Sequence, residues 1–454
     1  MGNDVLFGTD GIRGKFGEWP LTAPVIFNIG YAVAEFFGRA KNKKQKLKIL
    51  IGTDTRASGK AIERCLAQGF IQAKAEVYSA GVVPTPGLAF LTNVLDVDLG
   101  VMISASHNPA DDNGIKFFKH NGYKLREKEE REIEKIILHS LNHSQIKHKE
   151  RALKLKKISA QAYVKHLLKS VSGLSLEGMK IAIDCANGAL SKYAEKVFRA
   201  LGARVIQIHA CPDGKNINLH CGSLHPDQVS ALTLKAQADI GFSFDGDADR
   251  VIVCDERGDI RDGDYVMAAV AGGFSRQSRL AANTVVATSM SNFGLEKYLE
   301  KINVKLVRAD VGDKYVLEEI IKRKANFGGE QSGHLIFLDY ATTGDGLLSA
   351  LMILKLMADS KKKASKLAPG FRKYPQLLVN IKVREKKDFQ EMPLVAAQIK
   401  TAEQKLKGNG RLVIRYSGTE KLARVMVEGD SKSAIKKIAE AIALEIKKEI
   451  GILS

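Results

Sequence analysis

The chain is 454 residues long, which is too long to fold around a single hydrophobic core. A typical domain size of about 100–200 residues predicts several domains. Its 45% hydrophobic and 27% charged residues are typical of a globular protein and do not indicate disorder. A formal net charge of +19 would attract an anionic small molecule or a nucleic acid. No zinc-finger spacing, aromatic ribonucleoprotein motif or basic leucine zipper supports nucleic-acid binding. Solvated basic faces of helices and loops explain the basic runs better, at 41–48, 148–157 and 360–366.

The five cysteines occur without a CxxC pair. We therefore expect reduced, buried thiols rather than a disulfide framework or a zinc site. No run of about 18 apolar residues occurs, and the N-terminal segment lacks the basic and apolar regions of a secretory signal. These features predict a cytoplasmic protein with no membrane partner.

Strand-like and helix-like segments alternate along most of the chain. Apolar runs at 47–54 and 99–104 flank a helix-like segment at 58–75, and the same order repeats twice more before residue 360. Such alternation predicts βαβ units with mostly parallel sheets. A charge-dense helical stretch at 128–158 is expected to join the first two units. The segment 360–376 has the composition of a linker, and a small α+β unit is predicted after it.

The segment ISASHNP, residues 103–109, follows an apolar strand. It should therefore lie at a strand's carboxyl end, where open α/β sheets bind ligands. A serine there can be a nucleophile if a base or cation activates it, but the G-x-S-x-G pattern of hydrolases is absent. Considered alone, the segment is better explained as an Asn-Pro turn with a serine cap.

The segment FDGDADR, residues 244–250, places Asp245, Asp247 and Asp249 at alternate positions. The carboxylates share one face in a strand and converge in a turn, and their repulsion in either case indicates a hard cation such as Mg²⁺. An EF-hand is excluded because Arg250 stands where that loop needs glycine. A solvent-exposed acidic turn remains the alternative.

Three further glycine-containing segments carry polar side chains. GGEQSGH, residues 328–334, offers Glu330, Ser332 and His334 for hydrogen bonds to sugar hydroxyls. RYSGTE, residues 415–420, has the chemistry of a phosphate cradle, although a polar hairpin turn is the alternative. GTDGIRGK, residues 8–15, does not have the spacing between glycines that a Walker A loop requires. Its Arg13 is still a candidate anion contact.

Taken together, FGTDGIRG, ISASHNP with DNGIKFF, DGDADR, GGEQSGH, TTGDG and RYSGTE occur in the order seen in the α-D-phosphohexomutase family. The chain resembles that family from residue 7 to about residue 429. The resemblance implies an α/β fold of four domains around a central cleft. Three related α/β units with mixed sheets are expected at 1–155, 156–256 and 257–367, and a C-terminal TBP-like α+β domain at 368–454.

The resemblance also implies the roles of individual residues. Ser106 matches the phosphoserine. The Mg²⁺ ligands would be the phosphorylated Ser106, Asp245, Asp247 and Asp249. The sugar-binding loop would use Glu330 and Ser332, and the phosphate-binding loop Arg415, Ser417, Gly418 and Thr419, with Arg424 nearby. The positions at the reacting centre are Arg13, His107, Lys116, Arg250 and His334.

Lys116 and His334 are the candidates for general acid and base. Lys116 is favoured, on the expectation that neighbouring cations bring its pKa towards neutral pH.

The activity implied by the resemblance is reversible conversion of glucosamine 6-phosphate to glucosamine 1-phosphate, through phosphoserine and a glucosamine 1,6-bisphosphate intermediate. The product would feed UDP-N-acetylglucosamine and cell-wall synthesis. Gln331 and the SGTE sequence favour the amino sugar, whereas Lys421 and Ala423 depart from the Pro and Ile of bacterial relatives. Alternatives are a phosphomannomutase or phosphoglucomutase, a nucleic-acid-binding protein and a catalytically silent sugar-phosphate sensor. A homodimer is compatible with the resemblance.

Overall fold

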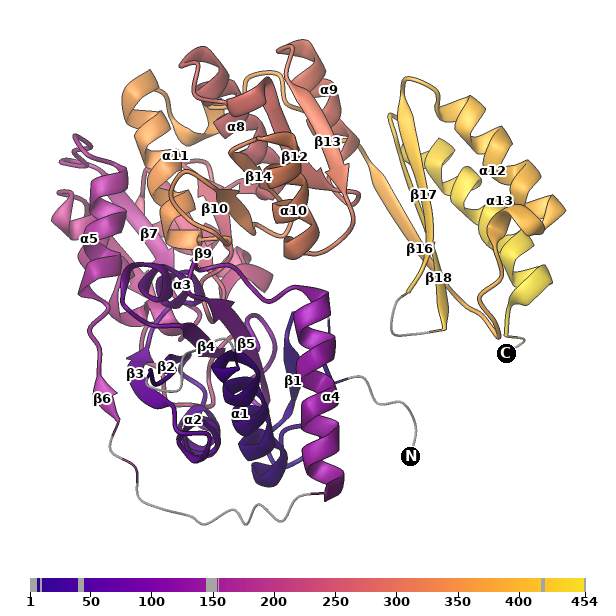
Figure 1. Cartoon of the computed structure of the whole chain (residues 1–454). Coiled ribbons are helices and arrows are strands. Elements are labelled where there is room, and N and C mark those ends of the chain that lie inside the picture. Colours follow the sequence, from indigo (N-terminus) through magenta and orange to yellow (C-terminus); the bar gives the residue numbers. More distant parts are fainter. Residues whose placement is uncertain are drawn as a thin grey trace. The chain divides into compact units, whose positions relative to one another are not determined.

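The computed structural model describes residues 6–8, 10–39, 45–143, 153, 155–417 and 421–452. The chain forms two compact units (Figure 1). The first comprises Met1–Thr288 and Val307–Ala368, and the second comprises Ser289–Leu306 and Pro369–Ser454. The last boundary lies inside the segment that was predicted to be the main linker. Residues 41–44 of the basic run 41–48, and residues 148–152 and 154 of the basic run 148–157, lie outside the described residues.

The first sheet has six strands in the order β1-β5-β4-β2-β3-β6. β2, β3, β4 and β6 are parallel, whereas β5 is antiparallel to both of its neighbours. Alternate residues of β2 pack into two cores: Ile49 and Ile51 face α1, α2 and α4, and Leu50 faces α3. The elements are β1 (Ile12–Lys15), α1 (Ala23–Gly38), β2 (Lys48–Thr53), α2 (Gly59–Gln72), β3 (Glu76–Val82), α3 (Thr85–Val94), β4 (Leu99–Ile103), β5 (Asp112–Lys119), α4 (Glu127–His143) and β6 (Lys156–Lys157).

The second and third sheets repeat the α/β pattern. The second has the order β11-β10-β9-β7-β8 and the third the order β13-β12-β14-β15. The second sheet's segment contains α5 (Gln161–Ser170), β7 (Lys180–Asp184), α6 (Ala194–Ala200), β8 (Arg204–Ile208), α7 (Asp227–Ala236), β9 (Ile240–Phe244), β10 (Val251–Asp255) and β11 (Ile260–Arg261). The third sheet's segment contains α8 (Gly263–Arg276), β12 (Thr284–Thr288), α9 (Phe293–Lys301), β13 (Lys305–Ala309), α10 (Asp313–Arg323), β14 (Phe327–Gly329), β15 (Leu335–Phe337) and α11 (Gly346–Ser360).

The second unit contains an antiparallel three-stranded sheet in the order β16-β18-β17. Its strands are β16 (Gln376–Lys382), β17 (Gly410–Tyr416) and β18 (Leu422–Gly429), and its two long helices are α12 (Pro393–Leu406) and α13 (Lys432–Ile450). Ile435, Ile442 and Ile446 of α13 are buried in the core with one face of the sheet. The predicted order of three α/β units followed by an α+β unit is confirmed.

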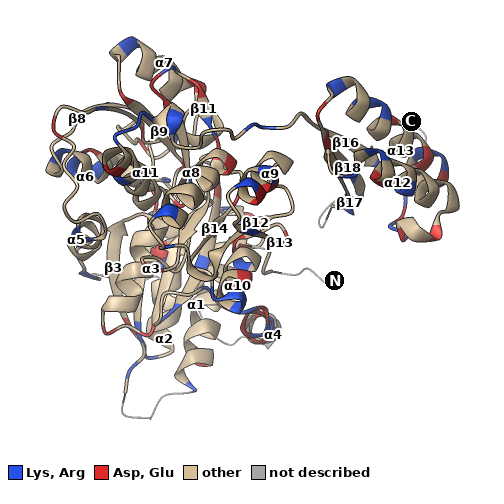
Figure 2. Cartoon of the chain, turned by 90° about the horizontal axis from the view of Figure 1, so that it is seen from above, with Lys and Arg blue, Asp and Glu red and all other residues tan. Residues whose placement is uncertain are grey.

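Surface features agree with most of the expectations from composition. Basic and acidic side chains are interleaved on α4, α12 and α13 (Figure 2), as expected for solvated helix faces. The cysteines are free, but Cys211 is exposed, so the expectation that all five are buried is wrong. Within the described residues, no helix is both long and apolar enough to cross a bilayer.

Glu428 is a buried carboxylate in the second unit that accepts several side-chain hydrogen bonds. Its carboxylate is 0% exposed and accepts hydrogen bonds from Arg411 at 2.7 Å, Asn292 at 3.0 Å and Gln376 at 3.2 Å. Arg411 also donates to the backbone oxygen of Ser291 at 2.9 Å. These hydrogen bonds therefore hold Ser291 and Asn292, which precede α9, against the three-stranded sheet.

Glu428→Ala is expected to destabilise the second unit, because it leaves the Arg411 guanidinium without its buried counter-charge, at a cost of about 3–5 kcal/mol. Backbone amides of β17 and β18 should then exchange their hydrogens on the order of a hundredfold faster or more. Glu428→Gln, which keeps the shape and acceptor oxygen, should have a smaller effect. Equal protection in the native chain and Glu428→Ala would contradict this role.

Candidate active site

Ser106 lies in the loop that follows β4. Its side chain is 1% exposed, and its backbone is left-handed, with φ of +53°. A non-glycine residue keeps this conformation only where its surroundings impose it. Its Oγ donates a hydrogen bond to Asp245 Oδ2 at 2.5 Å and lies 3.4 Å from His107 Nδ1. The serine that matches the phosphoserine therefore faces the predicted acidic cluster.

Ser104 caps the turn that presents Ser106. The Ser104 Oγ accepts the Ser106 N–H at 2.9 Å and donates to Asp54 Oδ2 at 2.6 Å. Arg56 forms a buried ion pair with Asp54 at 2.9 Å and donates to the Ser106 backbone oxygen at 3.0 Å. The predicted capped turn is thus present, and Ser104 is the residue that supports Ser106 within it.

Asp245, Asp247 and Asp249 lie in the turn between β9 and β10. Because they lie in a turn, their side chains converge, and one carboxylate oxygen from each lies within 4.8 Å of those of the other two. Their exposed fractions are 0%, 0% and 4%. The alternative of a solvent-exposed acidic turn is therefore wrong.

The acidic cluster has incompletely satisfied oxygens. Within the described part of the chain, Asp247 Oδ1 and Asp249 Oδ1 are buried without a hydrogen-bond partner. Burial, together with the charges of Asp249 and Asp247, raises the pKa of Asp245 well above its usual range. Burial would also raise the pKa of Asp249, but Lys116 and His334 outweigh it and lower that pKa. Carboxylate oxygens that repel one another are the ligands that a hard divalent cation prefers, so this donor set fits such an ion.

Lys116, on β5, is 1% exposed and lies among carboxylates. Its Nζ is 2.9 Å from Asp10, 3.2 Å from Asp247 and 3.6 Å from Asp249. Burial would lower the pKa of Lys116, but these carboxylates raise it well above its usual value, and Arg13 opposes them only weakly. The expectation that neighbouring cations bring its pKa towards neutral is therefore wrong, because the nearest charges are of opposite sign.

Arg13, Arg250 and His107 lie around the same cluster. Arg13 is paired with Asp10 at 2.6 Å, and the Arg250 backbone N–H donates to Asp245 at 3.1 Å. Burial and the charge of Arg250 lower the pKa of His107 to about 4, so this imidazole is neutral at pH 7. These three of the five residues assigned to the reacting centre are thus brought together with Ser106.

The GGEQSGH loop connects β14 and β15 and places His334 beside Asp249 of the acidic cluster. This residue is 2% exposed, its Nδ1 lies 3.6 Å from Asp249, and its Nε2 accepts the Gly344 N–H at 3.0 Å. Burial would lower the pKa of His334, but Asp249 raises it. Earlier in the loop, Ser332 donates to Glu330 at 3.0 Å, and both side chains are partly exposed.

The residues predicted to bind phosphate lie in the second unit. Arg415 on β17 and Arg424 on β18 are directly opposite in the antiparallel register. Facing guanidinium groups have the charge and the N–H donors that suit an anion. Ser417 is 4% exposed at the end of β17, and Gly418 and Thr419 lie outside the described residues.

Four models of the phosphoglucomutase/phosphomannomutase family match consecutive parts of the chain. They are alpha/beta/alpha domain I at residues 4–143, domain II at 161–258, domain III at 262–374 and the C-terminal domain at 378–445. The chain belongs to the phosphoglucomutase/phosphomannomutase family. The predicted four-domain fold class is thereby confirmed.

Known members of the family resemble the whole chain. A phosphoglucosamine mutase of Geobacter sp. (strain M21) is 46% identical over 449 residues, which cover 98% of each chain. A family member from Burkholderia thailandensis superposes with a TM-score of 0.78, at 22% identity over 99% of each chain. The Aspergillus fumigatus N-acetylphosphoglucosamine mutase, solved with GlcNAc-6P and magnesium, gives 0.65 at 18% identity over 98% of this chain and 95% of its own. These two structures share the fold.

Several residues that build the site in this family member were missed from the sequence. Thr85 donates to Asp247 Oδ2 at 2.6 Å, and Asn218 donates to the Ser106 backbone oxygen at 2.8 Å. Asp54 ends the strand-like run 47–54, so its position at a strand's carboxyl end was a usable signal. Thr85 and Asn218 carry no comparable local signal, because their partners are distant in the sequence.

A divalent cation at the acidic cluster is expected to stabilise the folded chain by about 2.7 kcal/mol at one hundred times its dissociation constant. Mg²⁺ titration followed by chemical unfolding measures this gain without any assay of activity. Asp245→Asn should remove most of the gain, because it replaces a carboxylate ligand by an amide. The control is Asp227→Asn, an exposed position on α7. An undiminished gain in Asp245→Asn would exclude the cluster as the binding site.

Proposed function

We propose that this family member interconverts glucosamine 6-phosphate and glucosamine 1-phosphate in the cytoplasm, using phospho-Ser106 and glucosamine 1,6-bisphosphate. The observation that carries the proposal is the position of Ser106, whose Oγ is 2.5 Å from one of three convergent buried carboxylates. Full-length similarity to a phosphoglucosamine mutase, 46% identical, supports the choice of sugar. A homodimer stays a prediction.

The reaction consists of two phosphoryl transfers in opposite directions. In the first, the sugar O1 hydroxyl attacks the phosphorus on Ser106, the Oγ–P bond breaks, and the O1 proton passes to a general base. In the second, the Ser106 Oγ attacks the 6-phosphoryl group of the bisphosphate, and O6 leaves with a proton. The serine is phosphorylated again and glucosamine 1-phosphate is released, so atoms and charge balance over the cycle.

The side chains around Ser106 have the charges that these transfers require. Lys116, held among carboxylates, offers an ammonium group to the oxygens of the phosphoryl group, and Arg13 offers a guanidinium. The acidic cluster and Ser106 would hold Mg²⁺, which when bound supplies positive charge against the charge that develops on the transferring group. Lys116 and His334 stay the candidates for acid and base.

The remaining predicted residues serve substrate recognition. Glu330 and Ser332, joined by a 3.0 Å hydrogen bond in a partly exposed loop, offer a carboxylate and a hydroxyl to sugar hydroxyls. The facing pair Arg415 and Arg424 offers guanidinium groups to the phosphate that is not being transferred. Ser417, Gly418 and Thr419 follow β17 in the same motif.

Ser106→Ala is expected to lower turnover at least about a thousandfold, because no other group can carry the phosphoryl between the two transfers. Mass spectrometry of the native protein should locate one phosphoryl group on Ser106, exchangeable with labelled substrate and absent from the variant. Ser104→Ala is the matched control: it keeps the phosphoryl carrier, loses two supporting hydrogen bonds of about 1–3 kcal/mol each, and should retain partial turnover. Full activity of Ser106→Ala would refute the mechanism.

Glucosamine 6-phosphate is expected to have a higher kcat/KM than glucose 6-phosphate or mannose 6-phosphate. A coupled assay with the three substrates at equal Mg²⁺ measures the order. A preference for glucose or mannose would assign the chain to the phosphoglucomutase or phosphomannomutase alternative. Binding of all three sugars without turnover by the phosphorylated protein would instead indicate a sensor.

A further inference from the structure

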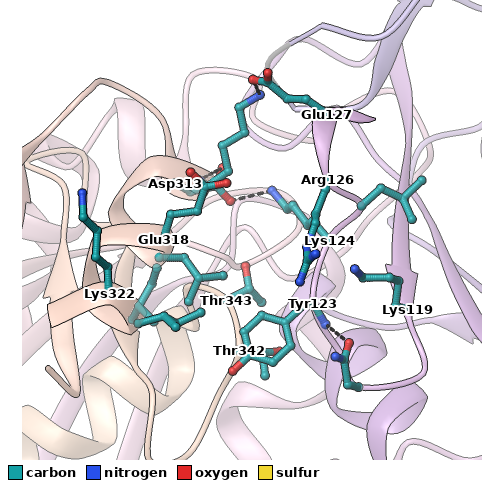
Figure 3. Close-up of a pocket in the computed structure, with 16 residues that line it drawn as sticks. Lys119, Tyr123, Lys124, Arg126, Glu127, Asp313, Glu318, Lys322, Thr342 and Thr343 are labelled. Carbon is teal, nitrogen blue, oxygen red and sulfur yellow. Dashed lines mark hydrogen bonds and ion pairs between the residues drawn. The ribbon is translucent and has the colours of Figure 1, made fainter. Parts of the chain in front are cut away.

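A cavity of about 390 Å³ lies in the first unit, between the segment that links β5 to α4 and the helix α10 (Figure 3). Its volume is within the range of small-molecule sites, about 300–1,000 Å³. Ser106, the three aspartates of the acidic cluster, Glu330 and Ser332 do not line it. The lining of the cavity thus does not include the residues at which the phosphoryl transfers are proposed.

The walls of this cavity combine an apolar body with a charged rim. Leu125, Leu317, Ile321 and Ile336 contribute aliphatic surface, and Tyr123 contributes an aromatic ring. Ile336 is 1% exposed, whereas Ile321 is 50% exposed on α10. An occupant that covers Ile321 would therefore gain the free energy of removing apolar surface from water.

Most of the basic side chains at the rim already have a carboxylate partner. Lys119 is 3.1 Å from Glu129, Lys314 is 2.8 Å from Glu127, and Lys322 is 2.7 Å from Glu319. Within the described residues, the Arg126 side chain makes no such pair, although it lines the cavity. Its five N–H donors are therefore available to an anionic group.

Glu318 stands on α10, on the opposite side of the cavity from Arg126 (Figure 3). Its carboxylate also has no ion pair or hydrogen bond within the described part of the chain, and it is exposed. The cavity thus presents a guanidinium on one side, a carboxylate on the other and apolar surface between them. A complementary occupant has an anionic group, an apolar or planar body, and a hydroxyl or amino donor.

The floor of the cavity is connected to the reacting centre by ion pairs. Lys124 lines the cavity and bridges Asp313 and Asp10, each at 2.5 Å. Asp10 in turn lies 2.9 Å from Lys116 and 2.6 Å from Arg13. An occupant that moves Lys124 would therefore change the charge beside Lys116.

We propose that this cavity is a regulatory site for a small amphipathic anion, held by Arg126 and the apolar face of α10 and sensed at the reacting centre through Lys124 and Asp10. The binding is independent of the proposed function, whereas the effect on turnover rests on it.

The experiment uses anilinonaphthalene sulfonate, an aromatic anion whose fluorescence rises on binding to apolar surface. The full chain should show a saturable binding component. Arg126→Gln removes the cation, and Ile321→Glu places a negative charge against the anion; both should weaken that component about tenfold. Both side chains are exposed or half-exposed, so the fold should tolerate the changes. The matched control is Lys128→Gln, which removes a charge of equal sign from an exposed position on α4 outside the cavity and should change binding less than twofold.

Turnover of glucosamine 6-phosphate is then measured with and without the probe. A change in kcat or KM that disappears in Arg126→Gln and Ile321→Glu, but persists in Lys128→Gln, supports the regulatory site. Unchanged probe binding in both cavity variants overturns the site itself. Weakened binding in both variants, with turnover that never responds to the probe, overturns the connection through Lys124. An enzyme inactive on every sugar phosphate would refute the proposed function and leave the binding result standing.

Discussion

The structure of the candidate active site depends on the burial of three like charges in one turn. Asp245, Asp247 and Asp249 have oxygens within 4.8 Å of one another and almost no contact with solvent. An uncompensated buried charge costs several kcal/mol, so the fold must supply positive charge beside the turn. Lys116 supplies part of it, yet two carboxylate oxygens stay without a hydrogen bond in the described residues. The incomplete compensation is what makes the turn suitable for a cation.

Ser106 is held by contacts from segments of two neighbouring sheets. Its left-handed backbone is stabilised by the Ser104 hydroxyl at its N–H and by Arg56 and Asn218 at its carbonyl oxygen. Arg56 follows β2 of the first sheet, whereas Asn218 belongs to the segment after β8 of the second. The position of the Oγ relative to Asp245 therefore reflects the packing of two α/β domains, and a change in either sheet would move it.

The features that could be predicted from the sequence are those determined by residues close together in the chain. Alternating apolar patterns predicted three α/β units and an α+β unit, and the DGDADR motif predicted three converging carboxylates. Ser106 was singled out only through the family resemblance, because its motif considered alone is better explained as a capped turn. The environment of Lys116 was predicted wrongly because cations were expected beside it, whereas its nearest charged neighbours are carboxylates of the β9–β10 turn and of Asp10, which are distant in the sequence. Thr85 was missed for the same reason: it touches Asp247, 162 positions away in the chain.

The charge of the site explains how an acidic turn can lie beside a phosphoryl group. Among the described residues, the linked network has five carboxylates and four permanently cationic side chains, which leaves one negative charge when every carboxylate is ionised: Asp10, Asp245, Asp247, Asp249, Asp313, Arg13, Lys116, Lys124 and Arg250. The raised pKa of Asp245 reflects the cost of that ionisation beside Asp247 and Asp249. A bound divalent cation would offset this cost and reverse the sign of the balance. The turn would then attract the phosphoryl group proposed for Ser106 instead of repelling it, and the overall charge of +19 would attract the sugar phosphate at longer range. Binding of the cation before phosphorylation of Ser106 is the order that these charges favour.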